Sequence, residues 1–244
     1  MRRAVCTGVS GSIGTAIAKA FLEAYPDVEL IGLYGSRPGA AEGLLGSGRF
    51  SLLQVDLRNP ESWEFPNEVE YLINNAGVGS GKELFADIPR DEIDELIAVN
   101  LLAPFLLAQR VIPHMVSVQF GRIVNVNSIW GIRGSARNGA YIATKHGLAG
   151  ISKAIAKDYA KAGVTCNEVC PGAVESRLMD SVLERIAGAS GSSQSAVRET
   201  LENSLNAGRM AYPSEIAQAV IWLCSDFAGH INGASLVVDG GEVC

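Results

Sequence analysis

A tyrosine and a lysine four residues apart, Tyr141 and Lys145 in the segment YIATK, form the pair in this sequence best suited to proton transfer. Residues at this spacing lie on one face of a helix, so a phenol and an ammonium can meet there. The phenol acts as an acid or base near neutral pH only if its pKa falls from about 10 by roughly three units, or about 4 kcal/mol. An ammonium about 4 Å away, at an effective dielectric near 20, supplies a Coulomb energy of about 4 kcal/mol before desolvation. We therefore expect Lys145 to lower the pKa of Tyr141, so that the phenol can donate a proton to a carbonyl oxygen while a hydride reaches the carbon.

Ser128 precedes Tyr141 in the chain and ends the apolar segment GRIVNVNS. Such a segment is typical of a buried strand, and open α/β sheets bind their ligands at the carboxyl ends of the strands. The position of the serine favours a catalytic interpretation of the Tyr141–Lys145 pair. The alternative is an exposed amphipathic pair on a helix.

The segment TGVSGSIG, Thr7 to Gly14, follows the first apolar run and opens a helical pattern. Backbone N–H groups at such a helix start can face a pyrophosphate at the positive end of the helix dipole. A loop of the form T-G-x-x-x-G-x-G would carry glycine at position 12, whereas here Gly11 and Ser12 have exchanged places. We predict a phosphate-binding loop in which the Ser12 hydroxyl donates to a phosphate oxygen. An ordinary strand-to-helix turn is the alternative.

The elements that must position these residues alternate between short apolar runs and helical patterns along the whole chain. This alternation predicts one α/β domain over residues 1–244, with a doubly wound sheet of about seven parallel strands flanked by helices. A barrel is disfavoured because a glycine-rich turn after the first strand is typical of the open dinucleotide-binding sheet. Two prolines between Asp56 and Asn74 predict a shortened crossover. Residues 177–208 carry helical pieces in a Ser-, Ala- and Gly-rich context, which indicates a mobile helical lid.

Composition excludes several function classes. The chain has 20 basic and 26 acidic residues, and this net charge of −6 argues against general nucleic-acid binding. Five cysteines without a CxxC pair indicate buried reduced thiols, and three scattered histidines make a metal site improbable. No apolar run approaches the roughly 18 residues of a membrane span, and the start MRRAVC leaves no room for a signal-peptide core, so we expect a cytoplasmic protein without membrane partners.

Taken together, the motifs resemble the classical short-chain dehydrogenase/reductases, with the 3-oxoacyl-acyl carrier protein reductase and 3-hydroxybutyrate dehydrogenase branches closest. The likeness covers nearly the whole chain. Besides TGVSGSIG, VNS and YIATK, it rests on VDL at Asp56, NNAG from Asn74 to Gly77, AVN at Asn100, CNEVCPGAVES at Asn167, and the ending VVDGG.

The resemblance implies a catalytic role for four residues. Tyr141 would be the general acid and base, and Ser128 the hydrogen-bond partner of the substrate carbonyl. Lys145 would depress the pKa of the tyrosine and bind the nicotinamide ribose. Asn100 would hold a water that links Lys145 to solvent, although a helix asparagine bonded to backbone is the alternative.

Cofactor contacts follow from the loop, the second strand and the resemblance together. The end of the second strand reads LYGSRP, which contains Arg37 and no carboxylate. An acidic residue there would bind the 2′-hydroxyl of NAD, whereas arginine accommodates the 2′-phosphate of NADP, so NADP(H) is favoured over NAD(H). A solvated loop charge is the alternative for Arg37. The predicted cofactor-binding residues are Gly8, Ser10, Gly11, Ser12, Ile13, Gly14, Ser36, Arg37, Asp56, Leu57, Asn75, Ala76, Gly77, Tyr141, Lys145, Pro171, Gly172, Val174 and Ser176.

The segment after Ser128 carries a bulky aromatic residue and two cations. Trp130, Arg133, Arg137 and Asn138 could form a pocket wall with a cation for an acidic or thioester-linked substrate. Loop packing and surface charge are the alternative.

These observations predict an NADPH-dependent reductase of a ketone, either a 3-ketoacyl or a small keto compound, that is reversible as an alcohol dehydrogenase. The alternatives are a non-catalytic cofactor-sensing protein on the same fold and an NADH-dependent alcohol dehydrogenase. The extended epimerase/dehydratase branch shares YxxxK but needs a larger C-terminal substrate domain. Two apolar helices, which contain residues 91–115 and Tyr141, resemble the four-helix dimer interface of the family, so we expect a homodimer or homotetramer.

Overall fold

A seven-stranded parallel sheet forms the centre of the computed structural model, which describes residues 2–81 and 83–243. Every neighbouring pair of strands is parallel. The strand order reverses between β1 and β4, where open α/β sheets form their ligand crevice. The predicted doubly wound α/β domain is therefore confirmed. In spatial order the strands are β3 (Phe50–Gln54), β2 (Val28–Tyr34), β1 (Arg2–Thr7), β4 (Tyr71–Asn74), β5 (Gly121–Val126), β6 (Val164–Pro171) and β7 (Ser235–Val238).

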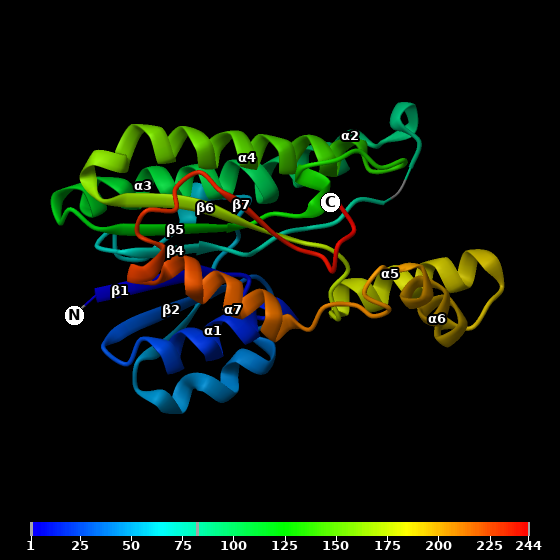
Figure 1. Cartoon of the computed structure of the whole chain (residues 1–244), viewed down its shortest axis with the longest axis horizontal. Coiled ribbons are helices and arrows are strands. Elements are labelled where there is room, and N and C mark those ends of the chain that lie inside the picture. Colours follow the sequence, from blue (N-terminus) through cyan, green and yellow to red (C-terminus); the bar gives the residue numbers. More distant parts are fainter. Residues whose placement is uncertain (1, 82, 244) are drawn as a thin grey trace.

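Helices cover both faces of the sheet. The helices α1 (Ser12–Ala24) and α7 (Pro213–Cys224) lie on one face, and α3 (Ala103–Ser117) and α4 (Gly139–Tyr159) lie on the other (Figure 1). Successive strand residues enter different cores: Ala4 packs in the cluster that contains Ile17, and Val5 packs in the cluster that contains Leu107. Because neither strand face meets water, the strands read as continuous apolar runs instead of alternating ones.

Two of the crossovers lack an α-helix. The β2–β3 connection holds a 3₁₀ helix at Gly39–Ser47, and the β3–β4 connection holds one at Pro60–Ser62. The predicted shortening before Asn74 is confirmed. Trp63 and Phe65 fill the space under this connection as buried side chains, and the Arg110 guanidinium donates to both of their carbonyl oxygens. Further 3₁₀ helices lie at Phe85–Asp87, Ile129–Gly131, Ala160–Ala162 and Asp226–Ala228.

A continuous helix combines α2 (Arg90–Ile97), a π-helical turn at Ala98–Leu102 and α3. By length and composition alone this helix, Arg90–Ser117, is long and apolar enough to cross a membrane. Half of its most apolar window is buried inside the fold. The buried residues pack against the sheet, as in the core helix of a globular domain.

The segment expected to form a lid contains two helices, α5 (Arg177–Ser190) and α6 (Gln194–Ser204). They project beyond the edge of the sheet that holds the carboxyl ends of the parallel strands (Figure 1). Helix α5 begins directly after the β6 segment and is capped by the Ser176 hydroxyl, which accepts from the Met179 N–H at 3.2 Å. The two helices therefore lie beyond the carboxyl ends of the strands, the position expected of a lid over a ligand bound there. Their closing motion stays a prediction.

Candidate active site

The loop between β1 and α1 has two glycines that the packing requires. Gly8 has φ of +70°, in the left-handed region, and a Cβ there would approach the Ala76 Cα at 2.8 Å. A Cβ at Gly14 would overlap the carbonyl oxygen of Gly8. Gly11, by contrast, has ordinary space, because its Cβ would meet only the Gly8 oxygen at 3.5 Å. The glycines that the fold needs are thus the two outer ones.

The start of α1 is open toward a ligand. Gly11 is the N-cap residue, no described side chain caps the helix, and its first turn holds no acidic residue. The N–H groups of the first turn and the positive end of the helix dipole are therefore available to an anion. This arrangement fits the pyrophosphate of a dinucleotide. The Ser12 hydroxyl accepts a long hydrogen bond of 3.4 Å from the Arg177 N–H, and its donation to a phosphate stays a prediction.

A neighbouring strand end braces the loop. The Asn75 side chain donates to the carbonyl oxygens of Thr7 and Gly8 at 2.9 and 3.2 Å. The N–H groups of Asn75 and Ala76 donate to the Thr7 hydroxyl at 3.0 and 2.9 Å. This bracing joins the β1 and β4 ends at the switch point of the sheet.

Two cavities of about 750 and 420 Å³ share wall residues and form one groove along the strand ends. Their sizes are those of typical ligand sites. The larger cavity runs from the phosphate loop to the end of β2, and the smaller one reaches Ser128 and Tyr141. The predicted cofactor-binding residues that line the groove are Gly8, Ser10, Gly11, Ser12, Ile13, Gly14, Ser36, Asp56, Leu57, Asn75, Ala76, Gly77, Tyr141, Lys145, Pro171, Gly172, Val174 and Ser176.

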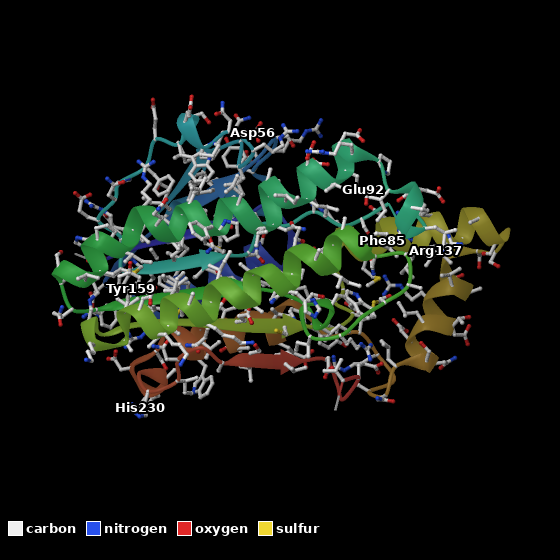
Figure 2. The ribbon with its side chains drawn as sticks, turned by 90° about the horizontal axis from the view of Figure 1, so that it is seen from above. Asp56, Phe85, Glu92, Arg137, Tyr159 and His230 are labelled. Carbon is white, nitrogen blue, oxygen red and sulfur yellow. The ribbon has the colours of Figure 1, made fainter. Side chains whose placement is uncertain are left out.

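Arg37 is the predicted cofactor residue that does not line the groove. It is exposed beside Ser36, which does line it. The cation in this part of the wall is Arg58, whose guanidinium binds the Asp56 carboxylate at 2.8 Å. The hydrogen bonds from Arg58 lower the pKa of Asp56. Asp56 follows the edge strand β3, and Figure 2 shows it near the upper border of the view.

Tyr141 and Ser128 meet in the smaller cavity. Tyr141 is in the first turn of α4, and Ser128 is the N-cap of the 3₁₀ helix after β5, where its hydroxyl accepts from the Trp130 N–H at 3.2 Å. The two side chains share a hydrogen bond. A carbonyl oxygen placed between them would meet two hydroxyl groups, one of them acidic.

The expected lowering of the Tyr141 pKa is not found. Burial raises the pKa of Tyr141, and the hydrogen bond with Ser128 lowers it in part. The Lys145 Nζ is 5.7 Å from the centroid of the tyrosine ring and donates to the Val126 carbonyl oxygen at 3.1 Å. Desolvation of the phenol therefore outweighs the attraction that the Coulomb argument assigned to Lys145, and Tyr141 is a protonated phenol at neutral pH.

Lys145 is buried beneath the cavity floor. Its side chain lies near Gly77, since a Cβ at that glycine would stand 3.9 Å from the Nζ. Burial lowers the pKa of Lys145 to about 8, while the charges of Cys170 and Glu168 raise it in part. The ammonium therefore loses its proton as the pH rises through about 8.

Asn100 lies in the π-helical turn and is 1% exposed. Its side chain clamps the loop after β4: Oδ1 accepts from the Val78 N–H and Nδ2 donates to the Val78 carbonyl oxygen, both at 2.9 Å. Asn100 does not line either cavity among the described wall residues. These two bonds leave one N–H and one lone pair of the amide, and the predicted water relay through Asn100 stays a prediction.

The wall of the smaller cavity next to the tyrosine comes from three segments. Trp130 and Asn138 line it as expected, and the Asn138 Oδ1 accepts from the Ser80 hydroxyl. Helix α5 adds one face at helical spacing, composed of Leu178, Met179, Ser181, Val182 and Arg185. Apart from Lys145, Arg185 is the only charged residue among the described residues of this wall, and it donates to the Gly81 carbonyl oxygen at 3.3 Å.

Arg133 and Arg137 do not line the cavity, contrary to expectation. Arg133 stacks over Trp130, with 4.9 Å from its Cζ to the ring, and donates to the Glu242 carbonyl oxygen at 2.7 Å. Arg137 is exposed, and Figure 2 shows it beside Phe85, whose ring also faces Gly139. The bond to Glu242 in the C-terminal segment thus holds Arg133 away from the cavity, while Arg137 is at the surface.

Two parts of the site escaped the sequence interpretation. One is the α5 face with Arg185, which the helical spacing of Leu178, Val182 and Arg185 could have indicated. The other is Glu168, a glutamate inside the apolar segment VTCNEVC, whose carboxylate accepts from the Asn127 Nδ2 at 2.7 Å. No group of three or more His, Cys, Asp or Glu side chains within residues 2–81 and 83–243 is placed to hold a metal ion.

Known proteins resemble the chain over nearly its full length. A family model described as Enoyl-(Acyl carrier protein) reductase matches residues 8–242. Nodulation protein G of Azospirillum brasilense is 32% identical and covers 98% of this chain and 96% of its own length. The 3-oxoacyl-acyl-carrier-protein reductase FabG of Aquifex aeolicus is 31% identical, and the match covers 96% of this chain and 94% of the relative. A crystal structure of an actinorhodin polyketide ketoreductase variant with NADPH has a TM-score of 0.89 at 27% identity. The match covers 98% of this chain and 96% of the ketoreductase chain.

Proposed function

This chain belongs to the classical short-chain dehydrogenase/reductases, oxidoreductases of CH–OH and keto groups, and from that premise we propose that it reduces a ketone to a secondary alcohol with NADPH. The observation that carries the proposal is the hydrogen-bonded Tyr141–Ser128 pair in a cavity continuous with the groove beside the phosphate loop. When bound, NADPH supplies the hydride. Ser128 holds the carbonyl oxygen, and Tyr141 donates the proton to it. The reverse reaction oxidises the alcohol.

Tyr141 carries its proton at neutral pH, which is the form needed to reduce a ketone. A protonated phenol is ready to donate when negative charge develops on the carbonyl oxygen, and Ser128 stabilises that charge by a hydrogen bond. The lysine ammonium beneath the cavity favours the phenolate that remains after donation. Helix α5 covers the substrate side with apolar residues, which excludes water from the reacting carbon.

The test follows nicotinamide absorbance with NADPH and NADH in parallel. The substrate panel comprises 3-ketoacyl thioesters, short keto acids, cyclic ketones and sugars. Turnover with NADPH supports the proposal, and turnover only with NADH supports an NADH-dependent alcohol dehydrogenase. Tight NADPH binding without turnover on any member of the panel supports a non-catalytic cofactor-sensing protein.

NADP(H) selectivity is proposed to come from Arg37. Arg37 follows the end of β2 and is next to Ser36, which lines the groove. The similar actinorhodin ketoreductase structure contains NADPH. Arg37→Ala is expected to raise the Kd of NADPH about tenfold, because hydrogen bonds to a charged phosphate contribute roughly 1.5–3 kcal/mol. The Kd of NADH should change less than twofold. Fluorescence titration measures both constants, and equal effects on the two cofactors would remove Arg37 from the 2′-phosphate site.

The substrate is proposed to carry an anionic group that Arg185 binds. The charged described residues of the cavity wall are Lys145 and Arg185, both cationic, and the rest of the α5 face is mainly apolar. Arg185→Ala should raise KM for keto acids by about tenfold, with little change for neutral ketones. Arg133→Ala is the matched control, because its guanidinium bonds to Glu242 outside the cavity. If both classes of ketone respond alike, Arg185 only supports the structure of α5.

The assembly and location belong to the same proposal. Leu102 and Phe105 leave apolar surface on the long helix, with exposed fractions of 44% and 47%. This surface supports a homodimer or homotetramer that pairs the α3 and α4 faces of two copies. A cytoplasmic location is part of the proposal.

A further inference from the structure

Glu168 is a buried carboxylate that the catalytic scheme does not use. It lies within β6 and is 1% exposed. Cys166, two residues earlier in β6, lies on the same face of the strand. The Asn125 Nδ2 donates to the Cys166 Sγ and also to the Ser152 hydroxyl of α4. This face of β6 therefore packs under the helix that carries Tyr141 and Lys145. A buried carboxylate is costly to the fold unless hydrogen bonds and a positive charge compensate it.

The hydrogen bonds of Glu168 suit its ionised form. One oxygen accepts from the Asn127 Nδ2 at 2.7 Å and the other from the Ser235 hydroxyl at 2.8 Å. A carboxylate accepts at both oxygens, whereas a protonated acid must also donate. The same Asn127 Nδ2 donates to the Lys145 carbonyl oxygen at 3.1 Å. Glu168 is thus linked through one amide to the turn of α4 that carries the lysine.

The charge of Glu168 also reaches the lysine. Among the described residues, the titratable groups that face Lys145 are Tyr141 on its own helix and Cys170 and Glu168 on β6. Burial raises the pKa of Tyr141 and raises that of Cys170 to about 12, so both are uncharged near pH 8. Glu168, whose two oxygens both accept hydrogen bonds, is then the remaining acidic group that acts on the ammonium.

We propose that Glu168 is a positioning residue of the active site: its carboxylate keeps the buried Lys145 protonated in the working pH range and, through Asn127, holds the turn of α4 that carries it. The catalytic meaning of this inference rests on the proposed function. Its physical content, the protonation of Lys145, does not.

The test titrates Lys145 directly by NMR in protein labelled with ¹³C at the lysine side chains, without substrate or cofactor. Lys145 is one of six lysines, and its signal is assigned by its loss in Lys145→Arg. In the wild type it is expected to titrate near 8. In Glu168→Gln, which keeps size and removes charge, its midpoint should fall by roughly one unit or more. Ser235→Ala keeps the carboxylate and serves as the matched control, with a much smaller displacement.

A second variant guards against a folding defect. Glu168→Met removes the charge with an apolar side chain of similar volume, and it should displace the Lys145 midpoint in the same direction. The proposal is overturned if Lys145 titrates at the wild-type pH in either folded variant. A wild-type midpoint already well below 7 would overturn it without any variant, because Glu168 would then not keep the lysine charged.

Activity supplies an independent readout. Where the substrate panel yields turnover, Glu168→Gln should lower kcat/KM about fivefold at pH 8 and less than twofold at pH 6, since a one-unit displacement deprotonates Lys145 at the higher pH. An equal loss at both pH values would indicate a purely structural role. Absence of turnover in the wild type would count against the proposed function and leave the titration to decide on Glu168.

Discussion

Tyr141→Phe is expected to lower kcat for ketone reduction by about 10²–10⁴-fold, the usual contribution of a positioned general acid. The substitution removes only the hydroxyl that bonds to Ser128, and it leaves the ring and its packing beside Lys145 in place. NADPH affinity should therefore change little. Steady-state kinetics and cofactor titration on the same preparation separate the two effects.

Tyr159→Phe is the matched control for this prediction. Tyr159 is the last residue of α4, whereas Arg137 precedes the first residue of this helix. Figure 2 shows Tyr159 and Arg137 at opposite ends of the molecule. It lines neither cavity. Its activity should match that of the wild type. A Tyr141→Phe enzyme that keeps more than a tenth of the wild-type kcat would show that another group donates the proton.

Gly14→Ala is the change in the phosphate loop with the largest expected effect on stability. The new Cβ would overlap the Gly8 carbonyl oxygen and lie 2.7 Å from the Asn75 Nδ2, and neither neighbour is a flexible chain end. Overpacking of this kind typically costs up to about 3 kcal/mol. In a chain of this length that cost lowers Tm by roughly 6–12 °C. Thermal unfolding without cofactor measures it.

Gly11→Ala, in the same loop, is the matched control. A Cβ at Gly11 makes an ordinary contact of 3.5 Å with the Gly8 oxygen, and φ is −79°. Its Tm should therefore lie within about 2 °C of the wild type. Equal destabilisation by the two alanines would mean that the close packing at Gly14 relaxes at little cost. A loss of NADPH affinity in a stable Gly11→Ala protein would support direct contact between the loop backbone and the pyrophosphate.

Helix α5 has two separate roles in these proposals. Its N-terminus lies over the phosphate loop, where the Arg177 N–H reaches the Ser12 hydroxyl, and its middle turns face the substrate cavity. Cofactor and substrate would therefore contact the same helix. This shared contact gives a physical reason for a cover that closes on the complete complex, because each ligand adds contacts to the closed position.

Local chemistry by itself determined much of this protein. Continuous apolar runs require a sheet covered on both faces, and the glycine-rich turn after the first run identifies the switch point at which a dinucleotide would bind. The spacing of Tyr141 and Lys145 and the strand-end position of Ser128 likewise follow from helix and strand periodicity. These features depend on residues close together in the sequence, which is why they can be predicted without coordinates.

Only the tertiary structure decided the charges and partners around that framework. Arg133 bonds to Glu242, 109 residues away, while Arg185 reaches Gly81 across 104 residues and enters the cavity. Glu168 meets Asn127 across 41 residues and places a carboxylate beneath the catalytic helix. The direction of the Tyr141 pKa was misjudged because a pairwise Coulomb estimate omits desolvation, which depends on how every neighbouring element packs around the phenol. Burial and long-range contacts are properties of the folded chain as a whole, so no local pattern specifies them.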